Sequence, residues 1–368
     1  PKYPCGAKNR EFFSYNNISE NAETDNKNII CRLEFQNKFL EIVCDYIINS
    51  LLNFKIDKNI FENEKNSVIE ELNEIIADTN YDFETAINSI LYKNHQRSIN
   101  QNLRLQNTKK ITINNIINFY NKNINPKNIV ISFVGNFNKT KLLNILKKLD
   151  VPSFTGNEVN YKLVPIKLSN NIFYYKNNKD ICNVKFIFKI PYTFFDDEYY
   201  TIYGLLDILT IDLNSIILKK LRSTEGLIYD LDASMDLDEV DKNLSIVMFS
   251  TSVNGNNLLK VIQFLIEIFN NIKNNYIEEE YINKYIESIN IKKQKHEFQK
   301  NPEQLLNEYS KYLLWNKKIF TLTHEYKCFS NVNKNNLKKI ANKIFDFKNL
   351  LICYDGTHNI NNKIKELL

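Results

Sequence analysis

Apolar positions in the second half of the chain follow strand-like and helix-like patterns in turn. Residues 181–190 and 243–253 are apolar at alternating or successive positions, which is typical of strands. Between Leu258 and Phe269 the apolar residues recur at helical spacing. The full pattern predicts strands at 171–176, 181–190, 227–235 and 243–253, a long helix at 197–221, several helices over 256–316 and a final helix–strand unit. We therefore expect an α+β fold with helices on one face of a mainly antiparallel sheet.

An ungapped internal repeat relates two distant segments. Residues 114–135 align with residues 335–356, an offset of 221. Each copy has the pattern of a helix, a short turn and an apolar strand that ends on glycine, at Gly135 and Gly356. Chance similarity of two helix–strand units is the alternative, but duplication is favoured because each copy also ends its half of the chain.

The repeat and a candidate linker predict the domain organisation. Residues 151–165 contain two prolines and a glycine and separate the two halves. We expect two homologous domains, residues 1–150 and 166–368, joined by this linker. Because the second half starts near residue 171, the offset places the start of a complete first half about 50 residues before Pro1. The repeat therefore predicts that the first domain lacks its initial strands and a helix.

Composition and charge narrow the class of protein. The chain is 43% hydrophobic and 25% charged, with seven Gly and seven Pro, which fits a globular protein rather than a disordered or collagen-like one. No apolar run approaches the roughly 18 residues that span a bilayer. The net charge of +5 is spread without a basic stripe, so we expect no nucleic-acid partner. Six scattered cysteines without C-x-x-C are typical of free thiols in a reducing compartment.

A predicted helix at 58–77 carries two carboxylates on one face. Glu64 and Glu71 are two helical turns apart, so both project from the same side with Val68 between them. Glu70 points about 100° away. Two stacked carboxylates can ligate a metal and orient a ligating group. A solvated helix face with Glu/Lys pairs is the alternative.

Six stretches resemble, in order and spacing, the insulinase/pitrilysin family of zinc metallopeptidases. They are Lys2-Tyr3-Pro4, ENAETD at 20–25, FLEIVCDYIINSLLNF at 39–54, EKNSVIEEL at 64–72, FYNKNINPKNIVISFVGNF at 119–137 and LRSTEGLIY at 221–229. The resemblance covers nearly the whole chain. It implies that the two α+β domains form one half of a clamshell around a closed chamber. A second copy or a homologous subunit would complete the clamshell.

The resemblance also implies a zinc site. In this family a His-x-x-Glu-His helix supplies two ligands and the general base, and a Glu about 75 residues further on supplies the third ligand. Glu71 matches that third ligand and Glu64 matches the supporting carboxylate, with Glu70 as the fallback. Two imidazoles and one carboxylate leave a position open for a zinc-bound water, whose pKa falls to about 7.

Two further groups match the family's substrate-binding residues. Asn21, Ala22 and Thr24 match an edge strand whose backbone pairs with an extended substrate, although the glycines usual before Thr24 are absent. Arg222 and Tyr229 match the pair that clamps the substrate backbone, because a guanidinium and a phenol can both donate to a carbonyl or to the developing oxyanion. A surface Arg and a Tyr at the start of a strand are the alternative.

The four histidines depart from the family pattern. None of His95, His296, His324 and His358 belongs to a His-x-x-Glu-His motif or to an i, i+4 pair. His95 matches a structural position of the family, and His296 and His324 are interpreted as solvated. The Lys-Tyr-Pro that commonly follows the motif stands at the start of the chain, so we expect the motif itself about half a dozen residues upstream. Truncation explains its absence better than decay.

The sequence therefore predicts a zinc-dependent endopeptidase that cleaves extended or unfolded peptides, such as presequences, in an enclosed chamber. The alternative is a non-catalytic homologue that acts as partner or core subunit of a processing peptidase or a respiratory complex. It would keep the chamber walls and lack zinc. A soluble chain of this kind fits the bacterial cytoplasm or periplasm and the mitochondrial or plastid interior alike.

Overall fold

The computed structural model describes residues 7–25, 27–52, 55–77, 81–148, 171–295, 299–315 and 317–368. The fold is α+β, as predicted, and it divides into two compact units that each take segments from both halves of the sequence. Unit 1 comprises Pro1–Tyr81, Ile99–Tyr161 and Pro302–Leu314, and unit 2 comprises Asp82–Ser98, Lys162–Asn301 and Trp315–Leu368. The linker predicted at 151–165 lies outside the described residues, so the boundary between domains 1–150 and 166–368 stays a prediction.

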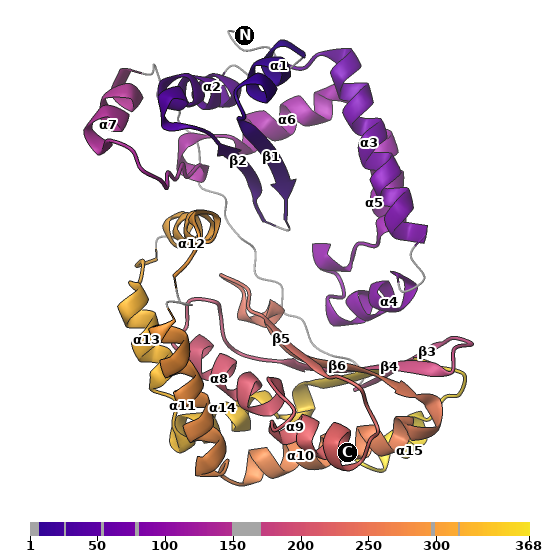
Figure 1. Cartoon of the computed structure of the whole chain (residues 1–368). Helices are drawn as coiled ribbons and strands as arrows, with labels where there is room; N and C mark the ends of the chain where they lie inside the picture. Colours follow the sequence, from indigo (N-terminus) through magenta and orange to yellow (C-terminus); the bar gives the residue numbers. More distant parts are fainter. Residues whose placement is uncertain are drawn as a thin grey trace. The chain divides into compact units, whose positions relative to one another are not determined.

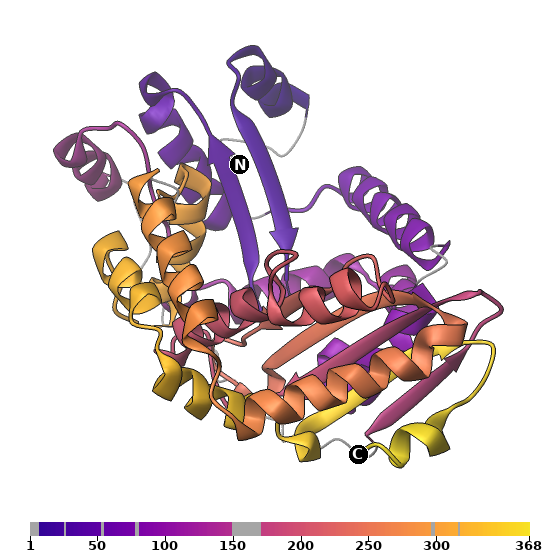
Figure 2. The same cartoon turned by 60° about the horizontal axis from the view of Figure 1, so that its bottom comes forward.

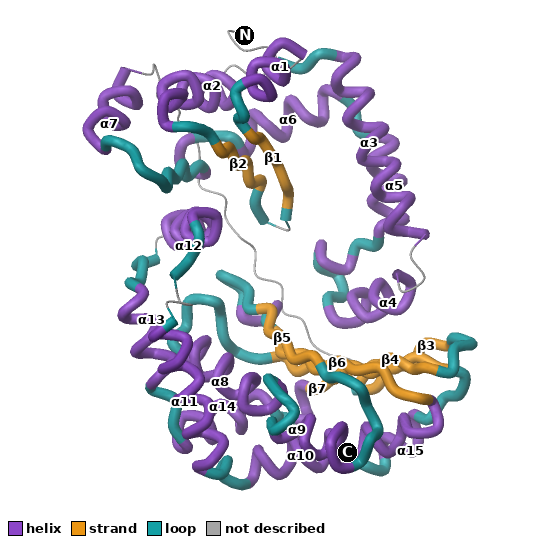
Figure 3. The backbone as a smooth tube through the Cα atoms, viewed as in Figure 1, coloured by secondary structure: helices purple, strands orange, loops and turns teal. Residues whose placement is uncertain are grey.

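Unit 1 consists of a two-stranded hairpin and helices (Figures 1 and 3). Its elements are α1 (Ala7–Tyr15), β1 (Ser19–Thr24), β2 (Ile29–Glu34), α2 (Leu40–Leu52), α3 (Lys58–Ala77), α5 (Gln101–Lys110), α6 (Ile113–Asn123), α7 (Lys139–Lys148) and α12 (Pro302–Leu314). Strands β1 and β2 are antiparallel. The buried side chains of Phe13, Ile18 and Val43 pack with the partly buried Leu33, so α1 and α2 form a small core with the hairpin.

Unit 2 contains a five-stranded sheet in the order β3-β7-β4-β6-β5, in which only the β3–β7 pair is parallel. Its strands are β3 (Ile172–Lys176), β4 (Ile181–Lys189), β5 (Asp232–Asp236), β6 (Ile246–Asn254) and β7 (Leu350–Gly356). Its helices are α4 (Tyr81–Leu91), α8 (Glu198–Thr210), α9 (Ile216–Leu218), the π-helix η4 (Lys219–Thr224), α10 (Leu258–Asn274), α11 (Glu279–Gln294), α13 (Leu322–Ser330), α14 (Lys334–Ile344) and α15 (Asn361–Lys365).

Helices cover both faces of this sheet, whereas the sequence pattern predicted cover on one face only. Figures 1 and 2 show α10 along one face, and α4 lies on the other. Phe188 of β4 meets Phe269 of α10 at a ring-centre distance of 5.3 Å. The neighbouring Ile187 instead packs with Phe83 and Ile87 of α4. Helix α4 was not expected here because it belongs to the first half of the sequence.

The predicted helix at 197–221 is interrupted by a turn. The Asp212 carboxylate accepts a 2.6 Å hydrogen bond from the amide of Asn214, and the Ser215 amide donates to the carbonyl of Asp212 at 3.0 Å. An aspartate that bonds the backbone two residues on favours a turn over a helix. The chain then continues as α9 and a π-helix, and β5 begins five residues later than the predicted strand at 227–235.

The internal repeat is present in the backbone with the same offset of 221. Helices α6 and α14 begin and end at equivalent positions, and each begins with a capping box, at Thr112 and at Asn333. A 3₁₀ turn follows each helix, and Gly135 and Gly356 have φ angles of 144° and 147°. Helices α3 and α11 also begin 221 residues apart. This agreement supports duplication rather than chance similarity.

The two copies differ where the predicted strand should form. Residues 350–356 form β7, which pairs with β3 on one side and β4 on the other. Residues 129–134 are not in a strand, and no strand in the described ranges pairs with them. The strand predicted for the first copy is therefore not observed, because a strand forms only where a neighbour accepts its backbone hydrogen bonds.

The two equivalent glycines provide a matched test of packing in unit 2. A Cβ atom added to Gly356 would lie 2.7 Å from the buried Cys182 Sγ, whereas nothing lies within 4 Å of one added to Gly135. Gly135→Ala should cost about 1–3 kcal/mol from backbone strain alone. Gly356→Ala should cost about 1–3 kcal/mol more from overpacking, as measured by equilibrium urea unfolding. Equal costs for the two variants would contradict the close contact.

Candidate functional site

The predicted substrate strand forms as β1. Asn21, Ala22 and Thr24 all lie in this strand, whose six residues are all exposed. Strand β1 pairs with β2 along one side, with Ala22 opposite Cys31. Along its other side, no strand in the described part of the chain pairs with it. Strand β1 is therefore an open edge, which is what strand addition requires.

The register of the hairpin determines which backbone groups point to the open edge. Just beyond the strand ends, the Asp25 amide donates to the Asn28 carbonyl at 3.0 Å. Hydrogen-bonded and non-hydrogen-bonded pairs alternate along an antiparallel ladder, so Glu23 and Asn21 bond to β2. The N–H and C=O groups of Glu20, Ala22 and Thr24 accordingly face the open edge.

Helix α3 has the predicted bounds, and both candidate carboxylates lie on its exposed side. Glu64 and Glu71 are exposed, and Val68 between them is 42% exposed. Ile75, one turn further along the same side, is 45% exposed. The adjacent side of the helix buries Leu72. The two carboxylates thus share a stripe with large apolar side chains, which differs from the Glu/Lys face of a purely solvated helix.

The described histidines belong to a different unit from these carboxylates. His95, His324 and His358 belong to unit 2, whereas α3 belongs to unit 1. His296 and the Lys2-Tyr3-Pro4 stretch lie outside the described residues. His324 is half-buried rather than solvated, because its ring stacks on Phe320 at 4.2 Å and its Nε2 lies 3.4 Å from the Cys328 sulfur.

The donor set determines whether a catalytic zinc fits. Among the residues that the structure describes, no three His, Cys, Asp or Glu side chains are grouped to hold a metal ion. A catalytic zinc site uses three protein ligands and one open position. Even if Glu71 served as a ligand, it would be one of three, so the described residues do not by themselves fit a catalytic zinc.

Arg222 and Tyr229 lie together in unit 2. The guanidinium carbon of Arg222 is 4.6 Å from the centre of the Tyr229 ring. Arg222 lies in the π-helix η4, and Gly226, with a φ of 62°, reverses the chain and donates its amide to the Arg222 carbonyl at 3.2 Å. The side chains therefore meet before β5 begins at Asp232, and the π-helix and turn bring them together rather than a strand starting at Leu227.

The charges around this pair leave Arg222 available. Glu225 forms ion pairs with Lys220 at 3.1 Å and Lys260 at 3.0 Å, and hydrogen bonds from Lys260 and Lys220 hold the pKa of Glu225 below its usual value. Arg222 forms no ion pair with any described residue. Tyr229 is 77% exposed. The pair thus combines an exposed phenol with a partly buried guanidinium that has no ion-pair partner among the described residues.

The internal repeat reveals a second, altered copy of the carboxylate face. The offset of 221 places Tyr285 and Lys292 of α11 where α3 has Glu64 and Glu71. Helix α8 packs against this face, with Asp207 carboxylate oxygen 3.7 Å from the Lys292 Nζ. Sequence reasoning missed Asp207, although the offset could have identified Lys292. An ammonium group stands in the second copy where the first has a carboxylate, so this copy cannot bind a metal in the same way.

The buried carboxylate in this second copy predicts a pH dependence of stability. Burial raises the pKa of Asp207 above its ordinary value, although Lys292 opposes the shift. A raised folded-state pKa contributes stability below the unfolded-state pKa, which is lost as pH rises through the folded-state pKa. Asp207→Asn should therefore gain urea resistance relative to wild type as pH rises from about 4 towards 7. Urea midpoints at several pH values measure this. A midpoint difference, variant minus wild type, that stays constant or falls as pH rises would contradict it.

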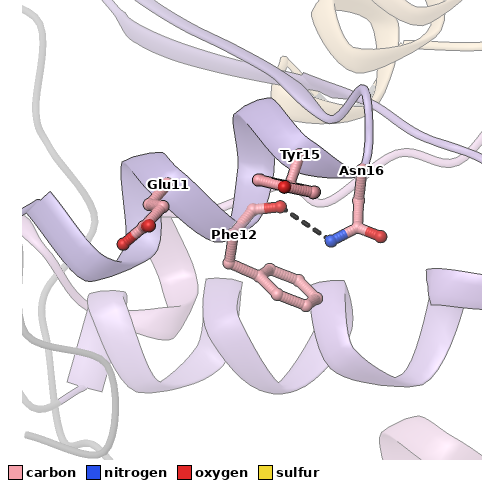
Figure 4. A pocket seen from close by; sticks show the side chains of 4 residues that line it. All are labelled: Glu11, Phe12, Tyr15 and Asn16. Carbon is pink, nitrogen blue, oxygen red and sulfur yellow. Dashed lines mark hydrogen bonds between the residues drawn. The ribbon is translucent and has the colours of Figure 1, made fainter.

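A shallow hollow on α1 contains none of the candidate site residues. It is lined by Glu11, Phe12, Tyr15 and Asn16, and the Asn16 side-chain amide donates to the Phe12 carbonyl at 2.8 Å (Figure 4). Tyr15 is 88% exposed, so the hollow is open to solvent and encloses no set of converging polar groups.

Among the described helices, none has the length and apolar character to cross a bilayer.

The chain thus combines two compact units, with an open edge strand in unit 1 and an Arg–Tyr ring contact in unit 2. Residues 110–289 match the family model described as the peptidase M16 inactive domain. This stretch, just under half of the chain, is thus similar to the inactive domain of M16 peptidases, and the insulinase-type resemblance is confirmed. Comparison with curated protein sequences gives no match.

Solved structures share this fold at low sequence identity. The periplasmic protease PqqL from Escherichia coli superimposes with a TM-score of 0.79 at 14% identity, covering 100% of this chain and 43% of that one. The peptidase M16 inactive domain from Pseudomonas fluorescens gives 0.78 at 10%, covering 95% and 84%. A chain of complex III2 from Candida albicans gives 0.73 at 12%, covering 95% and 85%. At these identities the likeness establishes the fold and not the activity.

Proposed function

We propose that this chain forms one half of an M16-type peptidase chamber and holds an extended polypeptide along β1. The observation that carries the proposal is the open edge, where Glu20, Ala22 and Thr24 direct backbone donors and acceptors outwards. A peptide added there is bound through its main chain. The substrate class is therefore defined by extended conformation rather than by one side chain, which fits unfolded peptides and presequences.

The Arg222–Tyr229 pair is proposed to hold the substrate from the second domain. Both side chains can donate to a peptide carbonyl, and the ring contact at 4.6 Å orients the guanidinium without occupying its N–H groups in an ion pair. In a clamshell the second domain of one half faces the first domain of the other. The pair would then act on a peptide bound at the partner's edge strand.

A second half is the expected partner. This chain spans 43% of the PqqL chain with which it shares the fold, which supports a complete chamber built from two halves, each the size of this chain. We propose that a second copy or a homologous subunit supplies the other half.

The catalytic form of this proposal is a zinc-dependent endopeptidase. Glu71 would be one zinc ligand and Glu64 its supporting carboxylate, with the remaining ligands supplied from outside the described residues. Bound zinc would supply an activated water for peptide hydrolysis. The exposed stripe of α3, with Val68 and Ile75 beside the carboxylates, supports a face that another element covers.

The alternative is a non-catalytic half that keeps the peptide-binding edge. One observation favours it: the family model that matches residues 110–289 is described as an inactive domain. The shared fold of a chain of complex III2 agrees with this alternative. In this form the chain would act as partner or core subunit of a processing peptidase or respiratory complex.

Proline at Ala22 tests the peptide-binding edge. Because the Ala22 N–H faces the open edge, Ala22→Pro removes an outward donor and leaves the hydrogen bonds to β2 in place. Binding of a fluorescein-labelled unfolded peptide, followed by anisotropy, should weaken about tenfold or more. Ala22→Ser keeps the N–H and should bind as wild type does. Unchanged affinity in Ala22→Pro would exclude β1 as the binding edge.

Zinc content tests whether this chain by itself holds a complete metal site. The 368-residue chain should retain well below one equivalent of zinc after mild chelation, because one carboxylate is one of about three required protein ligands. Elemental analysis of wild type and Glu71→Gln measures this, and both should give the same low value. Stoichiometric zinc that is lost in Glu71→Gln would show that this chain holds a complete site.

A further inference from the structure

A side-chain network on one face of β1 links this strand to helix α12. Arg32 of β2 lies opposite Asn21. Its Nη2 donates to the Glu23 carboxylate at 2.6 Å, and its Nε and Nη2 both lie 3.3 Å from the Asn307 side-chain oxygen. The Glu303 carboxylate is 3.7 Å from its Nε. We refer to Arg32, Glu23, Asn307 and Glu303 as the Arg32 network.

The geometry of this network requires arginine. One guanidinium bonds a carboxylate on β1 and an amide oxygen on α12 at the same time, through different N–H groups of a planar fork. A lysine ammonium is a compact point charge and cannot span the two partners in this way. Arginine is also uncommon in this chain, where lysine supplies most of the 48 basic residues.

The Arg32 network bonds one face of β1, and a residue of α2 bonds the opposite face. On the other face, the Tyr46 hydroxyl of α2 donates to the Glu20 carboxylate at 2.7 Å. Glu20 and Glu23 lie on opposite faces because side chains alternate along a strand. Each face of β1 is thus tied to a helix through a glutamate side chain, while no strand among the described residues pairs with its outer edge.

Helix α12 is itself fixed in unit 1. The Ser310 hydroxyl donates to the Ser132 hydroxyl at 2.7 Å, one turn beyond Asn307 on the same helix. In sequence this helix belongs to the second half of the chain, between α11 and α13. The conformation of the edge strand therefore depends on a segment 275 residues away from Arg32.

We infer that Arg32 is a positioning residue for peptide binding: by bonding Glu23 of β1 and Asn307 of α12, it holds β1 extended before a peptide arrives. This inference rests on the proposed function. Ordering a backbone residue costs conformational entropy, so a strand that is already ordered binds a peptide without that cost. Arg32 touches no substrate and acts through the strand that it fixes.

Hydrogen exchange tests the positioning role without any peptide. In Arg32→Lys, the amides of Asn21 and Glu23, which bond to β2, should exchange about tenfold faster than in wild type. Asn307→Ala removes only the link to α12 and should give the same change to a smaller extent. Arg104→Lys on the exposed surface of α5 is the matched control and should leave these rates unchanged. Unchanged exchange of Asn21 and Glu23 in both network variants would overturn the inference.

Peptide binding then separates this inference from the proposed function. Arg32→Lys should weaken binding of the labelled peptide several-fold while the urea midpoint changes little, because partly exposed ion pairs contribute little to stability. Faster exchange with no peptide binding by the wild-type chain would leave the positioning role intact and refute the proposed function. Faster exchange with undiminished peptide affinity would overturn the inference alone.

Discussion

The five-stranded sheet of unit 2 must be covered on both faces, and much of the architecture depends on this constraint. All seven residues of β7 are buried, and consecutive residues of β4 bury large side chains towards opposite sides. The helices of the second half cover one face, and α4, with Phe83 and Ile87, covers the other. Leaving that second face in water would cost about 25 cal/mol for each Å² of apolar surface. A helix from the first half of the sequence therefore belongs to unit 2.

The counterpart of α4 in the repeat makes the reverse exchange. Helix α12 begins 221 residues after α4 and belongs to unit 1, where its Asn307 bonds Arg32. Each unit thus contains one helix from the other half of the sequence. This arrangement gives α12 a role that its position in the chain would not suggest, because it lies beside the strand with the open edge.

The two copies of the repeat share a backbone path and differ in chemistry. The pair Glu64 and Glu71 on α3 corresponds to Tyr285 and Lys292 on α11. In the second copy an ammonium pairs with the buried Asp207, and in the first the carboxylates face solvent. Duplication preserved the caps, turns and glycines that specify the backbone, while the polar residues on one helix face became different. A similar fold therefore does not imply a similar site.

The sequence by itself determined the local features: the bounds of α3, the repeat with its capping boxes and glycines, and the family resemblance. These depend on residues close together in the chain, where spacing and propensity act directly. It also singled out Arg222 and Tyr229, which the π-helix and the Gly226 turn bring together. Tertiary structure decided which face each helix covers, which strands find a partner, and that Arg32 meets Asn307. Those outcomes depend on burial and hydrogen bonding between distant segments, and no local pattern encodes such pairings.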